Sequence, residues 1–102
     1  MTELSTSNFD ATVGSGIALV DFYAPWCQPC KVLSPKLEKL SGEYGNVAFG
    51  KVDIDQNPDL SERFGITALP TVIIFKEGQA KEKLFGNRSE DMYREAIKQA
   101  QE

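Results

Sequence analysis

Histidine is absent from this chain of 102 residues, and its absence excludes several kinds of catalytic site. Hydrolases that use a Cys-His pair or a Ser-His-Asp triad need an imidazole as general base, so neither arrangement can be built here. Cysteine is scarce too, since the chain has only two. Zinc in proteins normally takes four ligands, so no metal site is expected within one chain unless carboxylates complete the set. A metal or iron–sulfur cluster would have to be shared between two chains.

Basic clusters and long apolar runs are also missing. Lysine and arginine number 11 against 15 aspartates and glutamates, which gives a net charge of −4. Without a cluster that could neutralise several phosphates, nucleic-acid binding is not expected. No apolar run has membrane-spanning length, and the Met-Thr-Glu-Leu start lacks the positive and apolar regions of an export signal. We therefore expect a soluble, cytoplasmic protein without membrane contacts, in which a catalytic dithiol is commoner than a structural disulfide.

The overall composition is that of one globular domain. Hydrophobic residues make up 41% and charged residues 25% of the chain, which are ordinary values. A chain of this length can bury a core without disulfide bridges. We expect a single domain over residues 1–102, without repeats or linkers.

Both cysteines lie in the segment Trp26-Cys27-Gln28-Pro29-Cys30. The residues before it, 17–23, are apolar except for one carboxylate, and the residues after it have apolar side chains at helical spacing. This order predicts a strand followed by a helix, with Cys27 near the N-cap and Pro29 in the first turn, where proline is tolerated. The apolar residues expected along this helix are Val32, Leu33, Leu37 and Leu40.

This position has chemical consequences for the cysteines. The first turn of a helix has unpaired N–H groups and a positive dipole end, so a thiolate there is stabilised relative to a thiol. Residues three apart in a helix have Cβ atoms about 5–6 Å apart, so Cys27 and Cys30 can form a disulfide with little backbone movement. The alternative is a pair of inert buried thiols. CxxC spacing after a strand favours a redox switch.

Two charged residues fall within expected strands. Residues 17–24 are apolar on both alternating faces, which predicts a strand in the middle of a sheet covered by helices. Burial there would raise the pKa of Asp21 and make it a candidate general base that exchanges a proton with Cys30, unless Asp21 instead ends the strand in solvent. Lys51 lies in a second strand, roughly 47–54, either as a solvated edge charge or as the partner of Asp21.

Helix signals appear in the first half of the chain. A short N-terminal helix is expected with Thr6 or Ser7 as its cap, Asp10 as capping-box partner of Ser7, and Gly14 at its end. The helix after the cysteines should run from about 29 to 43, with Pro35 in its interior, where a kink is expected.

The second half contains further helix and strand signals. Asn57-Pro58-Asp59 should start a short helix that Gly65 ends. Pro70 precedes the apolar run 72–75, either as an edge or first strand residue or as a cis proline in a tight turn. Residues 80–85 should form a returning hairpin strand. Ser89 should open a last helix with an apolar face of Met92, Tyr93, Ala96, Ile97 and Ala100.

The expected order is helix, strand, helix, strand, short helix, strand, strand, helix. An alternating first half followed by a hairpin and a helix predicts an α/β sandwich with a mixed sheet.

Three segments resemble the signatures of the thioredoxin family, and the resemblance covers nearly the whole chain. Residues 20–31, Val-Asp-Phe-Tyr-Ala-Pro-Trp-Cys-Gln-Pro-Cys-Lys, are similar to the family's active-site segment. Residues 51–58 are similar to its second signature. Phe64-Gly65-Ile66 together with Leu69-Pro70-Thr71 is similar to its third. Gly78 and Gly86 fall where the family has its hairpin and rim glycines.

The resemblance implies a thioredoxin fold, a central mixed β-sheet flanked by helices, and protein-disulfide reductase activity. It implies that Cys27 is the attacking thiolate and Cys30 the resolving thiol, with a redox-active disulfide between them. Asp21, with Lys51 nearby, is implied as the buried proton-transfer pair. No bound cofactor is implied.

The resemblance also implies how the protein meets its partners. A cis peptide bond before Pro70 should face the disulfide, and Trp26, the backbone of Leu69, Pro70 and Gly86 should form an apolar rim that docks protein disulfide substrates. Electrons should come from a thioredoxin reductase-type donor that is itself supplied by a nicotinamide cofactor. A monomer is expected.

One position departs from the commonest family motif, which has glycine where this chain has Gln28. A larger polar side chain there can alter the reduction potential, the pKa of Cys27 or the choice of partner. Pro29 agrees with the reductants of the family, whereas oxidase and isomerase relatives commonly have histidine, so disulfide reduction is favoured. The competing hypotheses are a binding module that holds a partner on the rim around Trp26 and Pro70, with incidental redox activity, and a cluster shared across a dimer.

Overall fold

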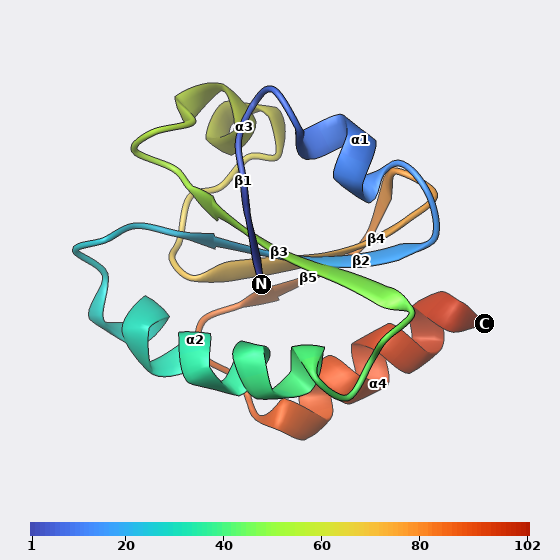
Figure 1. Ribbon diagram of the computed structural model, residues 1–102. Helices are drawn as coiled ribbons and strands as arrows, with labels where there is room; N and C mark the ends of the chain where they lie inside the picture. The colour runs from blue at the N-terminus through green and yellow to red at the C-terminus, as the bar shows by residue number, and fades with distance from the viewer.

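Five strands form one mixed sheet in the computed structural model, which describes all residues, 1–102 (Figure 1). The strand order is β1-β3-β2-β4-β5, in which β1, β3 and β2 are parallel and β4 and β5 are antiparallel to their neighbours. The expected α/β sandwich with a mixed sheet is confirmed. The strands span Thr2–Leu4 (β1), Ile17–Tyr23 (β2), Val47–Asp53 (β3), Thr71–Lys76 (β4) and Gln79–Phe85 (β5).

Four helices cover the two faces of the sheet in pairs: α2 and α4 lie on one face and α1 and α3 on the other (Figure 1). None of them combines the length and the apolar character needed to cross a membrane. The helices span Phe9–Val13 (α1), Gln28–Ser41 (α2), Pro58–Arg63 (α3) and Glu90–Gln101 (α4).

Each face of the sheet has its own hydrophobic core. On the α2 and α4 face, leucines of α2 pack against Tyr93 and Ile97 of α4. On the other face four phenylalanine rings have neighbouring centroids between 5.2 and 6.4 Å apart. Strand β2 contributes to both cores, so the prediction of a strand buried on both sides is confirmed. The four rings are those of Phe9, Phe22, Phe64 and Phe75.

Strand β1 is not among the elements expected from the sequence. It has three residues, of which only Leu4 is buried, so no periodic pattern could reveal it. It joins the sheet because Gly50 of β3 leaves room: a Cβ on Gly50 would lie 2.6 Å from Leu4 Cδ1. The consequence for the site is that β3 becomes an interior strand.

The capping prediction for the first helix is wrong. The N-cap residue of α1 is Asn8, and no side chain caps the helix. Thr6 donates its hydroxyl to a carboxylate of α3 instead of capping α1. Ser7 is exposed, and Asp10 pairs with Arg63 of α3 at 2.9 Å. The polar side chains here join two helices rather than satisfying the N–H groups of one.

Two residues expected on inner helix faces lie outside. Val32 is 58% and Met92 44% exposed, while the next residues, Leu33 and Tyr93, are buried. One residue turns an α-helix by about 100°, so Val32 and Met92 are rotated away from the core that their neighbours Leu33 and Tyr93 enter. The remaining elements are present with small differences at their ends; α2, for example, ends at Ser41.

Candidate functional site

The two cysteines lie beyond the carboxyl end of β2, where the chain enters α2 (Figure 1). Cys27 is the N-cap residue of α2, and Pro29 lies in the first turn, as expected. The backbone N–H of Cys30 donates to the sulfur of Cys27 at 3.3 Å. A disulfide joins Cys27 and Cys30, whose Cα atoms are 5.3 Å apart. The strand-to-helix junction therefore positions a disulfide with a backbone donor directed at its first sulfur.

The surface around the disulfide is largely apolar. Both cysteines are buried, but the neighbouring Trp26 is 67% exposed. The indole N–H of Trp26 donates to a carboxylate oxygen of Asp55 at 2.9 Å, which fixes the ring beside the disulfide. An open groove of about 560 Å³ runs past Cys27. It is lined by Trp26, Cys27, Gln28, Pro29, Ile54, Ile66, Thr67 and Leu69.

A turn before β4 borders this groove. The peptide bond between Leu69 and Pro70 is cis, which decides between the two interpretations of this proline. The N–H of Gly86, whose φ is +79°, donates to the carbonyl of Pro70 at 2.8 Å. The structure thus brings Leu69 to the groove and ties Gly86 to Pro70, although neither Pro70 nor Gly86 lines the groove itself.

Asp21 lies in β2 and is 2% exposed, so the interpretation in which it ends the strand in solvent is wrong. Its Oδ1 atom has no hydrogen-bond partner. Burial raises the pKa of Asp21 to about 7, a change that Lys51 opposes and Glu3 reinforces. A buried carboxyl with this pKa changes its protonation near neutral pH.

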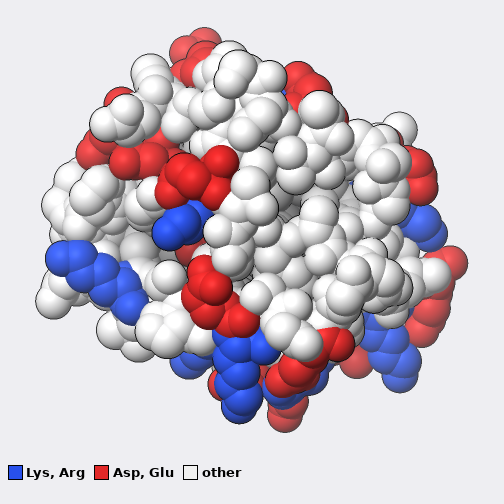
Figure 2. Space-filling view, viewed as in Figure 1, with Lys and Arg blue, Asp and Glu red and all other residues white.

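Lys51 lies directly opposite Asp21 in the pairing of β2 with β3. It is not a solvated edge charge, because β1 covers the other side of β3 and its side chain is 32% exposed. Its Nζ atom pairs with Glu3 at 3.8 Å and makes no ion pair with Asp21. Figure 2 shows a small basic area on this face of the molecule, with acidic side chains above and below it.

A narrow cavity of about 160 Å³ connects these charged residues to the disulfide. Asp21, Lys51 and Cys30 all line it, so the structure brings together three of the residues identified in the sequence. Glu3, beside the cavity, was missed because its strand is too short to be recognised. The lining residues are Asp21, Tyr23, Ala24, Pro25, Cys30, Lys31, Ser34 and Lys51.

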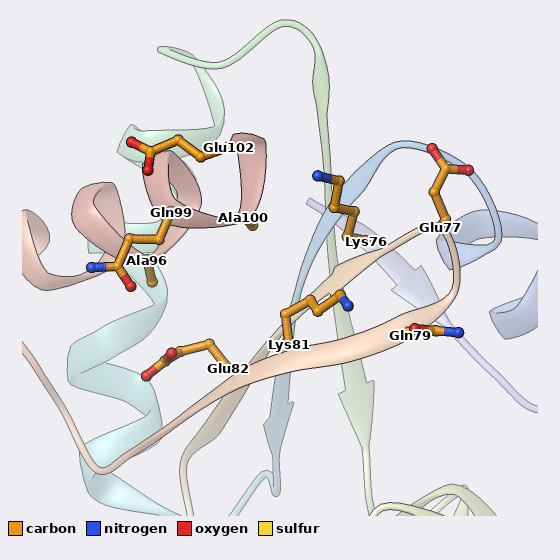
Figure 3. Close-up of a pocket in the computed structure, with 9 residues that line it drawn as sticks. All are labelled: Lys76, Glu77, Gln79, Lys81, Glu82, Ala96, Gln99, Ala100 and Glu102. Carbon is orange, nitrogen blue, oxygen red and sulfur yellow. The ribbon is translucent and has the colours of Figure 1, made fainter.

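A third depression lies between β5 and α4 and has a volume of about 590 Å³ (Figure 3). Its lining is mostly charged and polar and includes no cysteine, so it is separate from the disulfide. No group of three or more cysteine, aspartate or glutamate side chains is arranged to hold a metal ion. The lining residues are Lys76, Glu77, Gln79, Lys81, Glu82, Ala96, Gln99, Ala100 and Glu102.

Comparison with known proteins gives one family. The family model for thioredoxin matches residues 1–99. A thioredoxin of Chlamydia caviae is 41% identical over 88 residues, which are 86% of this chain and 86% of that protein. A thioredoxin of Staphylococcus saprophyticus is 40% identical over 98 residues, which are 95% of this chain and 94% of that protein.

Solved structures give the same result. The thioredoxin of Plasmodium falciparum has a TM-score of 0.89 at 31% identity, covering 97% of this chain and 98% of that chain. A mutant thioredoxin of Halobacterium salinarum has a TM-score of 0.91 at 31% identity, covering 99% of this chain and 90% of that chain.

Family membership also decides between the hypotheses that the sequence left open. A CxxC disulfide at the start of α2 on a thioredoxin fold favours redox chemistry over a binding module with incidental redox activity. The chain therefore belongs to the thioredoxin family, and it is a thiol–disulfide oxidoreductase that reduces protein disulfides.

Proposed function

We propose that Cys27 and Cys30 divide disulfide reduction into two exchange steps. The thiolate of Cys27 attacks a substrate disulfide, forms a mixed disulfide and releases the other substrate sulfur as a thiolate. Cys30 then loses its proton and attacks the Cys27 sulfur, which releases the second substrate thiolate and leaves the Cys27–Cys30 disulfide. Two electrons pass from the protein dithiol to the substrate.

The observation that carries this assignment is the position of Cys27 at the N-cap of α2. The N–H of Cys30 points to its sulfur at 3.3 Å, and the helix dipole adds positive potential at the same place. Both effects favour the thiolate, so we expect the pKa of the Cys27 thiol in the reduced protein to lie below that of a free cysteine.

Asp21 and Lys51 are proposed as the proton-transfer pair. Asp21 accepts the proton that Cys30 loses, across the cavity that both residues line. A general base works best when its pKa lies near the operating pH, and the pKa of Asp21 is about 7. Lys51, opposite Asp21 on β3, stabilises the carboxylate when it is ionised.

The residues around the disulfide are proposed to bind and discriminate partners. Trp26 and Leu69 offer apolar surface in the groove, and the turn of Pro70 and Gly86 borders it. Gln28 and Pro29 line the same groove between the cysteines, where they tune the reduction potential and the choice of partner.

The chain is further proposed to act as a monomeric, single-domain electron carrier of the cytoplasm, over residues 1–102. A thioredoxin reductase-type partner supplies electrons, and no bound cofactor is needed because the cysteine pair holds them. The net charge of −4 gives no support to nucleic-acid or membrane binding. A catalytic rather than structural use of the only cysteine pair fits a reducing compartment.

A trapping experiment tests the two-step assignment. In Cys30→Ser the mixed disulfide on Cys27 cannot be resolved, so protein adducts that dithiothreitol releases should accumulate. The Cys27→Ser, Cys30→Ser double variant is the matched control and should trap nothing. Failure of Cys30→Ser to trap a protein disulfide that the unchanged protein reduces would contradict the assignment.

Turnover tests the partner and the direction of the reaction. The protein should reduce protein disulfides continuously when a thioredoxin reductase and its nicotinamide cofactor are supplied. Equilibration against glutathione buffers then gives the reduction potential. The same measurement on Gln28→Gly tests the proposed role of Gln28, since an unchanged potential and unchanged reductase kinetics would exclude it.

A further inference from the structure

Three charged side chains form a row across three strands beneath the disulfide. Glu3 of β1 is paired in register with Lys51 of β3, and Lys51 is paired in register with Asp21 of β2. Residues paired in register project from the same face of a sheet, so Lys51 has one carboxylate on each side. The buried end of this row is Asp21, and the exposed end is Glu3, whose side chain is 52% exposed.

The cation in the middle of the row pairs with the outer carboxylate. Lys51 Nζ is 3.8 Å from Glu3 Oε1 and makes no ion pair with Asp21. It also lies 5.7 Å from the centre of the Tyr23 ring, close enough for a cation–π contact. The inner carboxylate, in contrast, has an oxygen with no hydrogen-bond partner.

The outer carboxylate is held in place by a second contact. The hydroxyl of Tyr23 donates to Glu3, at 3.0 Å from Oε1 and 2.9 Å from Oε2. Tyr23 also lines the cavity that contains Asp21 and Cys30. Glu3 lies on the three-residue strand β1, but its side chain is held by the hydroxyl of Tyr23 on β2 and by the ion pair with Lys51 on β3.

We propose that Glu3 is a positioning residue for proton transfer: braced by the Tyr23 hydroxyl, its carboxylate holds the Lys51 ammonium at the outer end of the row and leaves Asp21 able to carry a proton. This inference rests on the proposed role of Asp21 as the acceptor of the Cys30 proton. It adds a third residue, from a different strand, to the pair that the sequence suggested.

The charges of Glu3 and Lys51 shift the pKa of Asp21 in the directions that this proposal requires. Glu3 raises the pKa of Asp21 through its own negative charge, and Lys51 lowers it. Holding Lys51 outward weakens the second effect, so both actions of Glu3 favour the protonated carboxyl. The titratable and charged groups that face Asp21 or line its cavity are Lys51 from β3, Glu3 from β1, Tyr23 from β2, Cys30 and Lys31 from α2, and Tyr93 from α4.

The proton step shows where Glu3 acts. In the second exchange step the Cys30 thiol gives its proton to the ionised Asp21 while the Cys30 sulfur bonds to the Cys27 sulfur. The electron pair of the bond between Cys27 and the substrate leaves with the substrate sulfur. Without the Glu3 charge, Lys51 is free to pair with Asp21, which then becomes a weaker base.

The direct test is the titration of the Asp21 carboxyl carbon by NMR in the oxidised protein. Glu3→Gln keeps an acceptor for the Tyr23 hydroxyl but removes the charge. The midpoint of the Asp21 titration should fall by roughly 0.5 to 1 unit, a three- to ten-fold loss of proton affinity. Tyr23→Phe should shift it in the same direction by less. Glu43→Gln, which removes an exposed carboxylate that pairs with Arg94, is the matched control.

A double variant shows whether Glu3 acts through Lys51. Lys51→Gln should raise the Asp21 midpoint, and adding Glu3→Gln to it should then shift the midpoint less than Glu3→Gln does alone. Equal shifts in the two backgrounds, or a shift in Glu3→Gln no larger than in Glu43→Gln, would overturn the proposal.

A kinetic measurement separates this inference from the role proposed for Asp21. In Glu3→Gln the pH profile of substrate release from the mixed disulfide should move to lower pH together with the Asp21 midpoint. Unchanged release in Asp21→Asn would overturn the role of Asp21 as base and, with it, the kinetic part of this inference. If Asp21→Asn is slow but Glu3→Gln keeps the profile of the unchanged protein, only the role of Glu3 is overturned.

Discussion

Among single residues, Asp21 has the least favourable surroundings for a charge. It is buried within a central strand, one of its oxygens has no hydrogen-bond partner, and Lys51, its register partner on β3, pairs with another carboxylate. An uncompensated carboxylate costs free energy when it is buried, so the residue lowers the stability of the fold whenever it is ionised. Asp21 lines the same cavity as Cys30, and this position is what the proposed proton transfer requires.

This cost predicts a pH-dependent effect of Asp21→Asn. The pKa of Asp21 is raised from 3.8 to about 7 on folding, so the folded chain holds the proton more tightly than the unfolded chain. Stability is therefore lost as the pH rises through this interval, by up to about 4 kcal/mol. The substituted amide cannot ionise, so the stability of the variant relative to the unchanged protein should rise by roughly 3–4 kcal/mol between about pH 4 and about pH 8.5.

Urea unfolding of the oxidised variant and of the oxidised unchanged protein, at both pH values, measures this change. Any destabilisation by the buried amide that does not depend on pH is the same at both values and cancels. Asp10→Asn is an instructive control, because Arg63 lowers the pKa of Asp10 and the sign is reversed. That variant should lose stability relative to the unchanged protein as the pH rises. The same stability difference at both pH values for Asp21→Asn would show that Asp21 does not titrate as inferred.

At the scale of elements, two serines differ although both precede a helix. Ser89 is the N-cap residue of α4, and its hydroxyl accepts the N–H of Met92 at 3.3 Å. Ser7 precedes α1 but caps nothing. Ser89→Ala should therefore lower the free energy of unfolding by about 1 kcal/mol, and Ser7→Ala should change it by less than about 0.5 kcal/mol. Denaturant titrations compare them, and equal losses would contradict the observed caps.

Helix α4 also holds the turn that carries Gly86. The buried hydroxyl of Tyr93 accepts the N–H of Arg88 at 3.1 Å and donates to the carbonyl of Gly86 at 3.3 Å. Tyr93→Phe keeps the ring but leaves both backbone groups without this partner, so we expect a loss of about 1–3 kcal/mol in unfolding free energy. Because this turn borders the groove, the KM for a protein disulfide should rise while kcat changes less.

Tyr44→Phe is the matched control for the loss of a tyrosine hydroxyl. The Tyr44 ring stacks on Phe49, and its hydroxyl makes no hydrogen bond within the chain. Its stability should change by less than about 0.5 kcal/mol, and its kinetics should not change. A similar loss in both variants would mean that the Tyr93 hydroxyl does not hold the turn.

The elements differ in how far the sequence predicted them, for physical reasons. Strand β2 was predicted from a long apolar run, and helix α2 from apolar residues at helical spacing after a proline in the first turn. The cap of α1 was not, because Thr6 and Asp10 make their contacts with α3, which is distant in the sequence. Glu3 was missed for the same reason, since only pairing with β3 gives its segment a structure.

At the scale of the whole molecule, β2 joins two cores that lie on opposite faces of the sheet. Leu19 packs with the core under α2 and α4, whereas Val20 and Phe22 pack with the phenylalanine rings under α1 and α3. Because both cores contain side chains of β2, loss of this strand from the sheet would disrupt both of them. The two faces should therefore unfold together as a single domain.

Core substitutions on opposite faces test this expectation. Leu37→Ala, on the buried face of α2, should lower the free energy of unfolding by roughly 2–5 kcal/mol, and Phe9→Ala, on the other face of the sheet, by roughly 3–5 kcal/mol. In each variant the fluorescence of Trp26 and the far-ultraviolet circular dichroism should report one transition with the same midpoint. Because Trp26 lies at the disulfide end of the sheet, a separate fluorescence transition in one variant would show that the two faces unfold independently and that the chain is not one cooperative domain.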